Sequence, residues 1–375
     1  MRLKVAESVI KMKRLLSALV ALLCIFPVAA CGVQGGYESA DAQLREQLPE
    51  ASSLADPRSF TGVSRVDGFA DVEPVSNNVS PMLPVELTDA DGHDVVVDDV
   101  SRILALDLYG TYTKTLTGLG LADNIVGRTV SSTEDILSDL PVVTQGGHNI
   151  NVEAVLDLQP TLVMVDHSIG PNDAIDQIRA AGVTTVVMEP TRTIDSVDED
   201  IKTVAQVVGL PEEGDKLAQR STEELEKDRA AIEELVPEQP LRMAFLYARG
   251  NGGVFFILGE GTGAKDLIEG IGGVDMATEH NLSYAAPANA ESLAQINPEV
   301  IIMMNKGLES TGGIDGLLER PGVAQTIAGQ NRRIVTLPDG QSLAFGPLAG
   351  QTLLKLAQAT YDPENSIDGS QSESE

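Results

Sequence analysis

The stretch Arg242–Gly259, RMAFLYARGNGGVFFILG, decides the fold of this chain. Two apolar runs, Met243–Tyr247 and Val254–Leu258, lie on either side of a glycine-rich turn. A short buried run bounded by glycine predicts a strand that is covered on both faces, as in the parallel sheet of an α/β protein. Tyr247 and Arg249 are two positions apart, so we expect their side chains to point the same way from the end of that strand. Open α/β sheets bind their ligands at the carboxyl ends of the strands.

A phenol beside a guanidinium has a specific chemical use. The cation favours the ionised form of the phenol, and tyrosinate is a known ligand of haem iron. The alternative is structural: a core tyrosine with a hydrogen-bonded hydroxyl, next to an arginine at the surface. Tyr247 and Arg249 alone favour the structural alternative.

Strand-like runs alternate with helical patterns on both sides of this stretch, which is typical of an α/β protein. One segment, Glu212–Leu235, is rich in charged residues, has no glycine after Gly214 and contains no proline. Its sparse apolar stripe predicts a long helix. We therefore expect two Rossmann-like lobes joined by one long α-helix. The predicted boundaries are an N-terminal lobe at residues 85–210, a connecting helix at 211–238 and a C-terminal lobe at 239–361.

The two predicted lobes share an internal repeat. Residues 151–160, NVEAVLDLQP, match residues 289–298, NAESLAQINP, and an apolar run follows each copy. Glu153 and Glu291 occupy the same place in the repeat, two residues after an asparagine that suits a helix N-cap. Two similar lobes predict a cleft between them, and clefts between domains are where small ligands bind.

The two ends of the chain differ from this pattern. Residues 1–30 have a basic start, an apolar run and small residues before Cys31, which predicts a signal peptide and resembles a bacterial lipobox. We expect a lipid on Cys31, a flexible spacer at 31–84 and a disordered acidic tail at 362–375. The protein would then lie at the extracytoplasmic face of the cell membrane, anchored by the lipid. The net charge of −30 argues against nucleic acid as a partner.

Several motifs together resemble one family, the substrate-binding lipoproteins of ABC importers with two α/β lobes and a rigid helix between them. The resemblance covers about residues 95 to 361. Within that class the runs GGHNINVEAV, FLYARGNGGVFFILG and AFGPLAG look like the haem receptors of the corynebacterial type. The FLYARG motif is specific within the class, whereas the general pattern of the lobes is shared with siderophore and cobalamin binders.

The resemblance implies roles for individual residues. By motif, His148 and Tyr247 match the two iron ligands, and Arg249 matches the arginine that hydrogen-bonds the tyrosine. Tyr284 is a candidate for the haem pocket, because its loop precedes the second repeat helix as the loop of His148 precedes the first. Glu153 and Glu291 match the glutamates that meet arginines of the permease. The implied ligand is haem, and the implied partners are an ABC permease with its ATPase and, as donor, free haem or another surface haem protein.

Other functions stay open at this point. A ferric siderophore or cobalamin fits the same fold, although a siderophore binder usually presents several basic residues and the lobe edges offer mainly Arg249. A receptor for a bare metal ion needs three or four ligands, and only His148 and His167 lie on loops that face the predicted cleft. The chain contains neither a G-x-S-x-G nucleophile motif nor a Walker A sequence, so we expect a binding protein and not an enzyme.

Overall fold

The first of the two lobes is built on a short parallel sheet. The computed structural model describes residues 40–49, 53–189, 193–250 and 252–365. Three strands pair in the order β4 (Ile103–Leu106), β7 (Leu162–Asp166) and β8 (Thr184–Met188). Every residue of β4 and β7 is buried, because helices and loops cover both faces of the sheet. Around it lie α3 (Thr111–Gly118), α4 (Val152–Asp157), α5 (Asn172–Ala180), α6 (Val197–Val207), the turns η3 (Ala122–Asn124) and η4 (Asp135–Leu137), and the hairpins β2 (Val85–Thr88)–β3 (Asp94–Val97) and β5 (Thr144–Gln145)–β6 (Asn149–Ile150).

The second lobe contains a larger mixed sheet. Its strand order is β1 (Val63–Arg65), β14 (Ile334–Leu337), β13 (Val300–Met304), β9 (Arg242–Arg249), β10 (Val254–Leu258) and β12 (Ala285–Pro287), and β11 (Val274–Asp275) pairs with β9. The helices of this lobe are α8 (Ala264–Gly270), α9 (Met276–Glu279), α10 (Ala290–Ile296), α11 (Asn305–Ser310), α12 (Gly313–Leu318), α13 (Ile327–Gln330), α14 (Asp339–Ser342) and α15 (Ala349–Tyr361).

Strand β9 is buried on both faces, as predicted, but its two long neighbours run in opposite directions. Met243 and Phe245 pack into one apolar cluster, whereas Ala244 and Leu246 pack into the cluster on the opposite face. The pairing with β13 is parallel, but the pairing with β10 is antiparallel. The strand is covered on both faces as predicted, but the sheet is mixed and not parallel throughout, because strands that are joined by a short turn run antiparallel.

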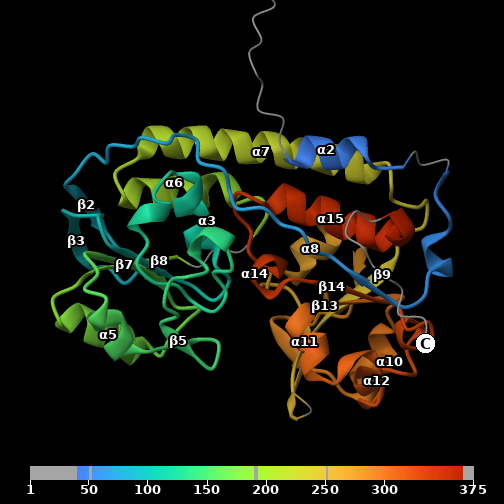
Figure 1. Ribbon diagram of the computed structural model, residues 1–375. Helices are drawn as coiled ribbons and strands as arrows, with labels where there is room; N and C mark the ends of the chain where they lie inside the picture. The colour runs from blue at the N-terminus through green and yellow to red at the C-terminus, as the bar shows by residue number, and fades with distance from the viewer. Residues whose placement is uncertain (1–39, 50–52, 190–192, 251, 366–375) are drawn as a thin grey trace, which may run out of the picture. The chain divides into compact units, whose positions relative to one another are not determined.

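The long helix between the lobes is α7 (Pro211–Glu233), and it confirms the predicted architecture. It packs against α6 of the first lobe and α15 of the second, as Figure 1 shows. Leu217, Leu225 and Ile232 are buried on one face of α7, and they belong to an apolar cluster that also includes residues of both sheets. A continuous core thus runs through both lobes and the helix.

The prediction of a flexible spacer at 31–84 is wrong for the part that the structure describes. Helix α2 (Ala40–Glu46) packs on α7 and α15, and the turn η2 (Pro57–Ser59) follows. Strand β1 then adds to the second sheet, parallel to β14. These elements are too short to show a hydrophobic period, and contacts with distant parts of the chain order them.

The described part of the chain begins at residue 40 and ends at residue 365. Residues 1–39, with the predicted signal peptide and Cys31, lie outside the described residues. The prediction of a disordered tail at 362–375 is wrong for residues 362–365: Asp362 is buried, and its N–H donates to the carbonyl of Gln358 at 2.8 Å. The short turn η5 (Pro363–Asn365) follows, and residues 366–375 are outside the described part. Among the described residues, none of the helices has both the length and the apolar character that a membrane span requires.

Candidate functional site

Tyr247 and Arg249 lie on one face of β9, as their spacing predicted. Both side chains are half-buried, and the guanidinium carbon of Arg249 is 4.7 Å from the centre of the Tyr247 ring. Cross-strand pairing places Val254 of β10 opposite Arg249 and Phe256 opposite Tyr247. The cation therefore lies against the π face of the phenol, which is an attractive geometry.

Arg249 has a second partner, Asp339, that the sequence did not predict. Its Nη2 donates to Oδ1 of Asp339 at 2.6 Å, and the same nitrogen is 3.3 Å from the sulfur of Met304. Asp339 begins α14, directly after strand β14 and Pro338. In the sequence, Asp339 is an acidic residue at the carboxyl end of a strand. That position alone does not identify Arg249 as its partner.

His148 lies on the other lobe, in the turn of the β5–β6 hairpin. Its side chain is exposed, and its carbonyl accepts a hydrogen bond from the N–H of Gly170 at 3.0 Å. Gly146 and Gly147 precede it with φ of 60° and 91°, a backbone conformation that favours glycine. Asn151 caps the next helix, α4, by accepting from the N–H of Ala154 at 3.2 Å. The predicted cap at this helix is therefore confirmed, and a short anchored turn presents His148.

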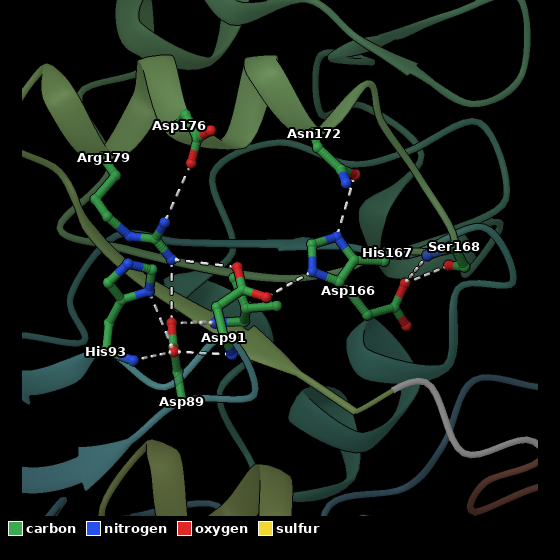
Figure 2. Close-up of polar contacts among 10 residues, drawn as sticks. Asp89, Asp91, His93, Asp166, His167, Ser168, Asn172, Asp176 and Arg179 are labelled. Carbon is green, nitrogen blue, oxygen red and sulfur yellow. Dashed lines mark hydrogen bonds and ion pairs between the residues drawn. The ribbon is translucent and has the colours of Figure 1, made fainter.

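His167, the other histidine considered for the cleft, is engaged in a separate polar cluster (Figure 2). Its Nε2 is 2.7 Å from Asp91, which lies in the β2–β3 turn, and its Nδ1 is 3.2 Å from Asn172 of α5. The hydrogen bond with Asp91 raises the pKa of His167 despite partial burial. Both ring nitrogens thus hold the loop after β7 in place, which is a structural role. That loop includes Gly170, the residue that bonds the turn of His148.

The polar cluster of Figure 2 extends to the neighbouring strands. Arg179 of α5 donates to Asp89 at 3.0 Å, and Asp89 also accepts from the backbone of His93 at 2.8 Å. His93 therefore belongs to this network, and 50% of its side chain is exposed. Within the described residues, no three His, Cys, Asp or Glu side chains are grouped so that they could hold a metal ion.

Tyr284 is the most exposed of the large apolar side chains of the described residues, at 71%. Its φ is 55°, and its N–H donates to the carbonyl of Glu260 at 2.8 Å. Its ring would be 3.4 Å from a Cβ at Gly261, so the ring lies over that glycine. Tyr112, by contrast, is buried and donates its hydroxyl to Asp166 at 2.8 Å, so it belongs to the core.

Glu153 and Glu291 occupy equivalent places in the two lobes. Each is exposed in the first turn of its helix, α4 or α10. Asn289 caps α10 by accepting from the N–H groups of Glu291 and Ser292 at 3.0 Å, as Asn151 caps α4. The repeat in the sequence thus corresponds to two helix starts of the same kind. A carboxylate in a first helical turn also interacts favourably with the helix dipole.

The comparisons with known proteins agree with this architecture. The family model described as "Periplasmic binding protein" matches residues 107–340. A crystal structure of the heme-binding protein HmuT has 65% identity, covers 82% of this chain and 100% of that chain, and has a TM-score of 0.81. The periplasmic heme-binding protein RhuT from Roseiflexus sp. RS-1 has 34% identity, with 71% and 99% coverage and a TM-score of 0.65.

A curated relative gives the same class. It is an uncharacterized ABC transporter substrate-binding lipoprotein, YvrC of Bacillus subtilis (strain 168), and it is 22% identical over 285 residues, which are 75% of this chain and 86% of the relative. The resemblance drawn from the motifs is therefore confirmed at the level of the family. The chain belongs to the periplasmic binding protein family.

Proposed function

We propose that this protein binds haem between its two lobes and is the substrate-binding component of an ABC importer. The observation that carries the proposal is that three residues of this chain have the same spacing in the sequence as three residues of HmuT. Solved structures of HmuT include alanine variants of a histidine, a tyrosine and an arginine, whose residue numbers differ by 99 and by two. The same intervals separate His148, Tyr247 and Arg249 in this chain.

The chemistry of these residues suits the ligand. Ferric iron is a hard acid, and tyrosine and histidine are known ligands of haem iron, so Tyr247 and His148 would supply the two protein ligands. Arg249 would balance the negative charge of the phenolate from its place against the ring. Haem is the cargo here, and the family binds substrates for transport, which is not an enzymatic class.

Exposed apolar side chains accompany both proposed ligands. Val254 is 40% exposed and pairs with Arg249 across the β9–β10 hairpin. On the other lobe Val130 is exposed, and its N–H donates at 3.1 Å to the hydroxyl of Thr144, which begins β5. Apolar surface of this kind favours a flat, largely apolar porphyrin. Tyr284, a further candidate for the pocket, lies beside Gly259, at the opposite end of β10 from Val254.

A haem titration tests the proposal. We expect a sharp Soret band, shifted from that of free haemin, that saturates as haemin is added. Tyr247→Phe should abolish or greatly weaken binding, because it removes the phenol oxygen and keeps the ring. His148→Ala should weaken binding less, since water can take its coordination position. The matched control is His93→Ala, which removes a partly exposed histidine of the same lobe. An unchanged spectrum and affinity in Tyr247→Phe would contradict the ligand assignment.

The same titration separates the alternatives within this fold. A protein that carries a ferric siderophore or cobalamin would leave the spectrum of free haemin unchanged and would bind those ligands instead. Arg249 is the cation on the predicted ligand face of β9, whereas an anionic siderophore usually meets several basic residues. Haem is therefore the better-supported ligand.

We also propose that Glu153 and Glu291 dock the protein on its permease. Both are exposed at equivalent helix starts of the two lobes, and charged groups at an interface rim steer association and fix its register. The double change Glu153→Ala, Glu291→Ala should leave haem binding intact and reduce transport with the permease and its ATPase. The control is the double change Glu86→Ala, Glu319→Ala, which also removes one exposed glutamate from each lobe. Uptake at the wild-type rate in the first variant would mean that these carboxylates only stabilise their helices.

The sequence around Cys31 suggests how the protein is attached to the membrane. Periplasmic binding proteins act outside the cytoplasm, and the relative YvrC is named a lipoprotein. We propose that Cys31 carries a lipid after removal of residues 1–30, as the lipobox-like sequence suggests. Cys31→Ala should release the protein from membranes or block its processing. Mature variant protein that fractionates with membranes as the wild type does would contradict this.

A further inference from the structure

One carboxylate connects the proposed iron ligand to the rest of the fold. Asp339 accepts from Nη2 of Arg249 at 2.6 Å through one oxygen, and from the N–H of Lys306 at 3.1 Å through the other. Arg249 in turn lies against the ring of Tyr247. Each oxygen of Asp339 therefore has a donor, and the guanidinium lies between an aspartate and a tyrosine.

The position of α14, and with it that of Asp339, depends on a hydrogen bond from the N-terminal lobe. The next residue, Gly340, accepts through its carbonyl from Nζ of Lys114 at 2.8 Å, and Lys114 belongs to α3 of the N-terminal lobe. Lys114 is only 1% exposed, and its ammonium also donates to the carbonyl of Gly110 at 3.2 Å. A buried ammonium is costly unless it is hydrogen-bonded, so this contact strongly favours the observed position of α14.

The backbone of α14 also fits closely against that lobe. A Cβ at Gly340 would lie 2.4 Å from the carbonyl oxygen of Ser131 and 2.6 Å from the hydroxyl of Thr133. Both residues belong to the N-terminal lobe, so α14 lies directly at the contact between the lobes. The side chain of Asp339 thus extends from a segment whose position depends on both lobes.

We infer that Asp339 is a positioning residue for haem binding: it holds Arg249 against Tyr247 and links that arrangement to the contact between the lobes. The inference rests on the proposed function, because it concerns the residues assigned to the iron. A long arginine side chain has many rotamers, and a short charged hydrogen bond selects one of them. Asp339 would not touch the iron or the porphyrin to have this effect.

The test is the change Asp339→Asn, which keeps the size of the side chain and removes its charge. The haem complex is followed by its visible spectrum and by haem release to excess apomyoglobin. We expect release to be about tenfold faster, within the range of coupling between contacting residues, and the spectrum to shift in the same direction as in Arg249→Ala. Asp339→Glu keeps the charge and should restore the wild-type spectrum.

A double variant separates positioning from an independent effect. If Asp339 acts through Arg249, the double change Arg249→Ala, Asp339→Asn should release haem no faster than Arg249→Ala alone. Fully additive effects would overturn the inference. Slower release in Asp339→Asn would also overturn it, because the carboxylate would then act through its own charge and oppose the tyrosinate.

A matched control is available in the same lobe. Asp315 accepts from Arg332 at 2.8 Å, so Asp315→Asn breaks another aspartate–arginine pair, and we expect wild-type haem release and spectrum. An unchanged Asp339→Asn variant beside a haem-binding wild type would refute the positioning role alone. A wild-type protein that does not bind haem would instead refute the proposed function.

Discussion

Replacing Asp228 by asparagine should change how the stability of this protein depends on pH. Asp228 lies on α7, is 0% exposed and pairs with Arg45 of α2, which also donates to Glu224 at 2.8 Å. Asp41 of α2 belongs to the same cluster and accepts from Gln351 of α15 at 2.6 Å. Three carboxylates thus surround one arginine where α2 meets α7 and α15.

The expected magnitude follows from the pKa of Asp228. Burial, and then the charge of Asp41, raise this pKa from 3.8 to about 7. A carboxyl whose pKa is raised in the folded state stabilises the fold fully below its unfolded pKa, and the stabilisation is lost as the pH rises through about 7. Each pKa unit corresponds to about 1.4 kcal/mol, so the loss approaches about 4 kcal/mol. If α2 detaches locally, the repulsion between Asp228 and Asp41 is relieved. The loss of about 4 kcal/mol is therefore an upper limit.

The assay is urea denaturation of the wild type and Asp228→Asn at pH about 5 and about 8. Asparagine carries no ionisable proton, so the variant should gain up to about 2.5 kcal/mol relative to the wild type between these pH values, which is the part of the loss that falls between pH about 5 and about 7. The lost ion pair with Arg45 changes the absolute stability. The pH-dependent gain should nevertheless persist, because asparagine cannot acquire the buried negative charge. Asp215→Asn is the control, because Asp215 lies on the same helix with 73% of its side chain exposed. Parallel pH profiles of Asp228→Asn and the wild type would refute the reasoning.

Two further changes test the packing of the lobes. Tyr361→Phe removes a buried hydroxyl that donates to the carbonyl of Ile271 at 2.7 Å, so thermal denaturation should show a loss of about 1–3 kcal/mol. A melting temperature equal to that of the wild type would contradict it. Gly340→Ala places a Cβ 2.4 Å from the carbonyl oxygen of Ser131, and we expect a loss of about 1–3 kcal/mol from overpacking. Gly253→Ala is its control, since a Cβ there meets nothing within 4 Å, and equal stability of the two variants would exclude the clash.

Local patterns in the sequence predicted the helices and strands that depend on residues close together in the chain. The apolar run before Arg249 predicted β9, and the sparse stripe of Glu212–Leu235 predicted a long helix that the structure has as Pro211–Glu233. The repeat predicted two helices with the same asparagine cap, now seen at Asn151 and Asn289. The spacing of Tyr247 and Arg249 predicted their common face, because side chains alternate along a strand.

The tertiary structure decided the contacts that no local pattern encodes. Arg249 and Asp339 are ninety residues apart, and only the approach of α14 to β9 makes them a pair. Asp228 is a charged residue on the long helix α7, yet it is buried, and Arg45 of α2 pairs with it there. Residues 53–84 carry no period, and β1 is ordered by pairing with β14. A period or a cap reflects energies within one or two turns of the chain, whereas these contacts exist only after distant segments have packed together.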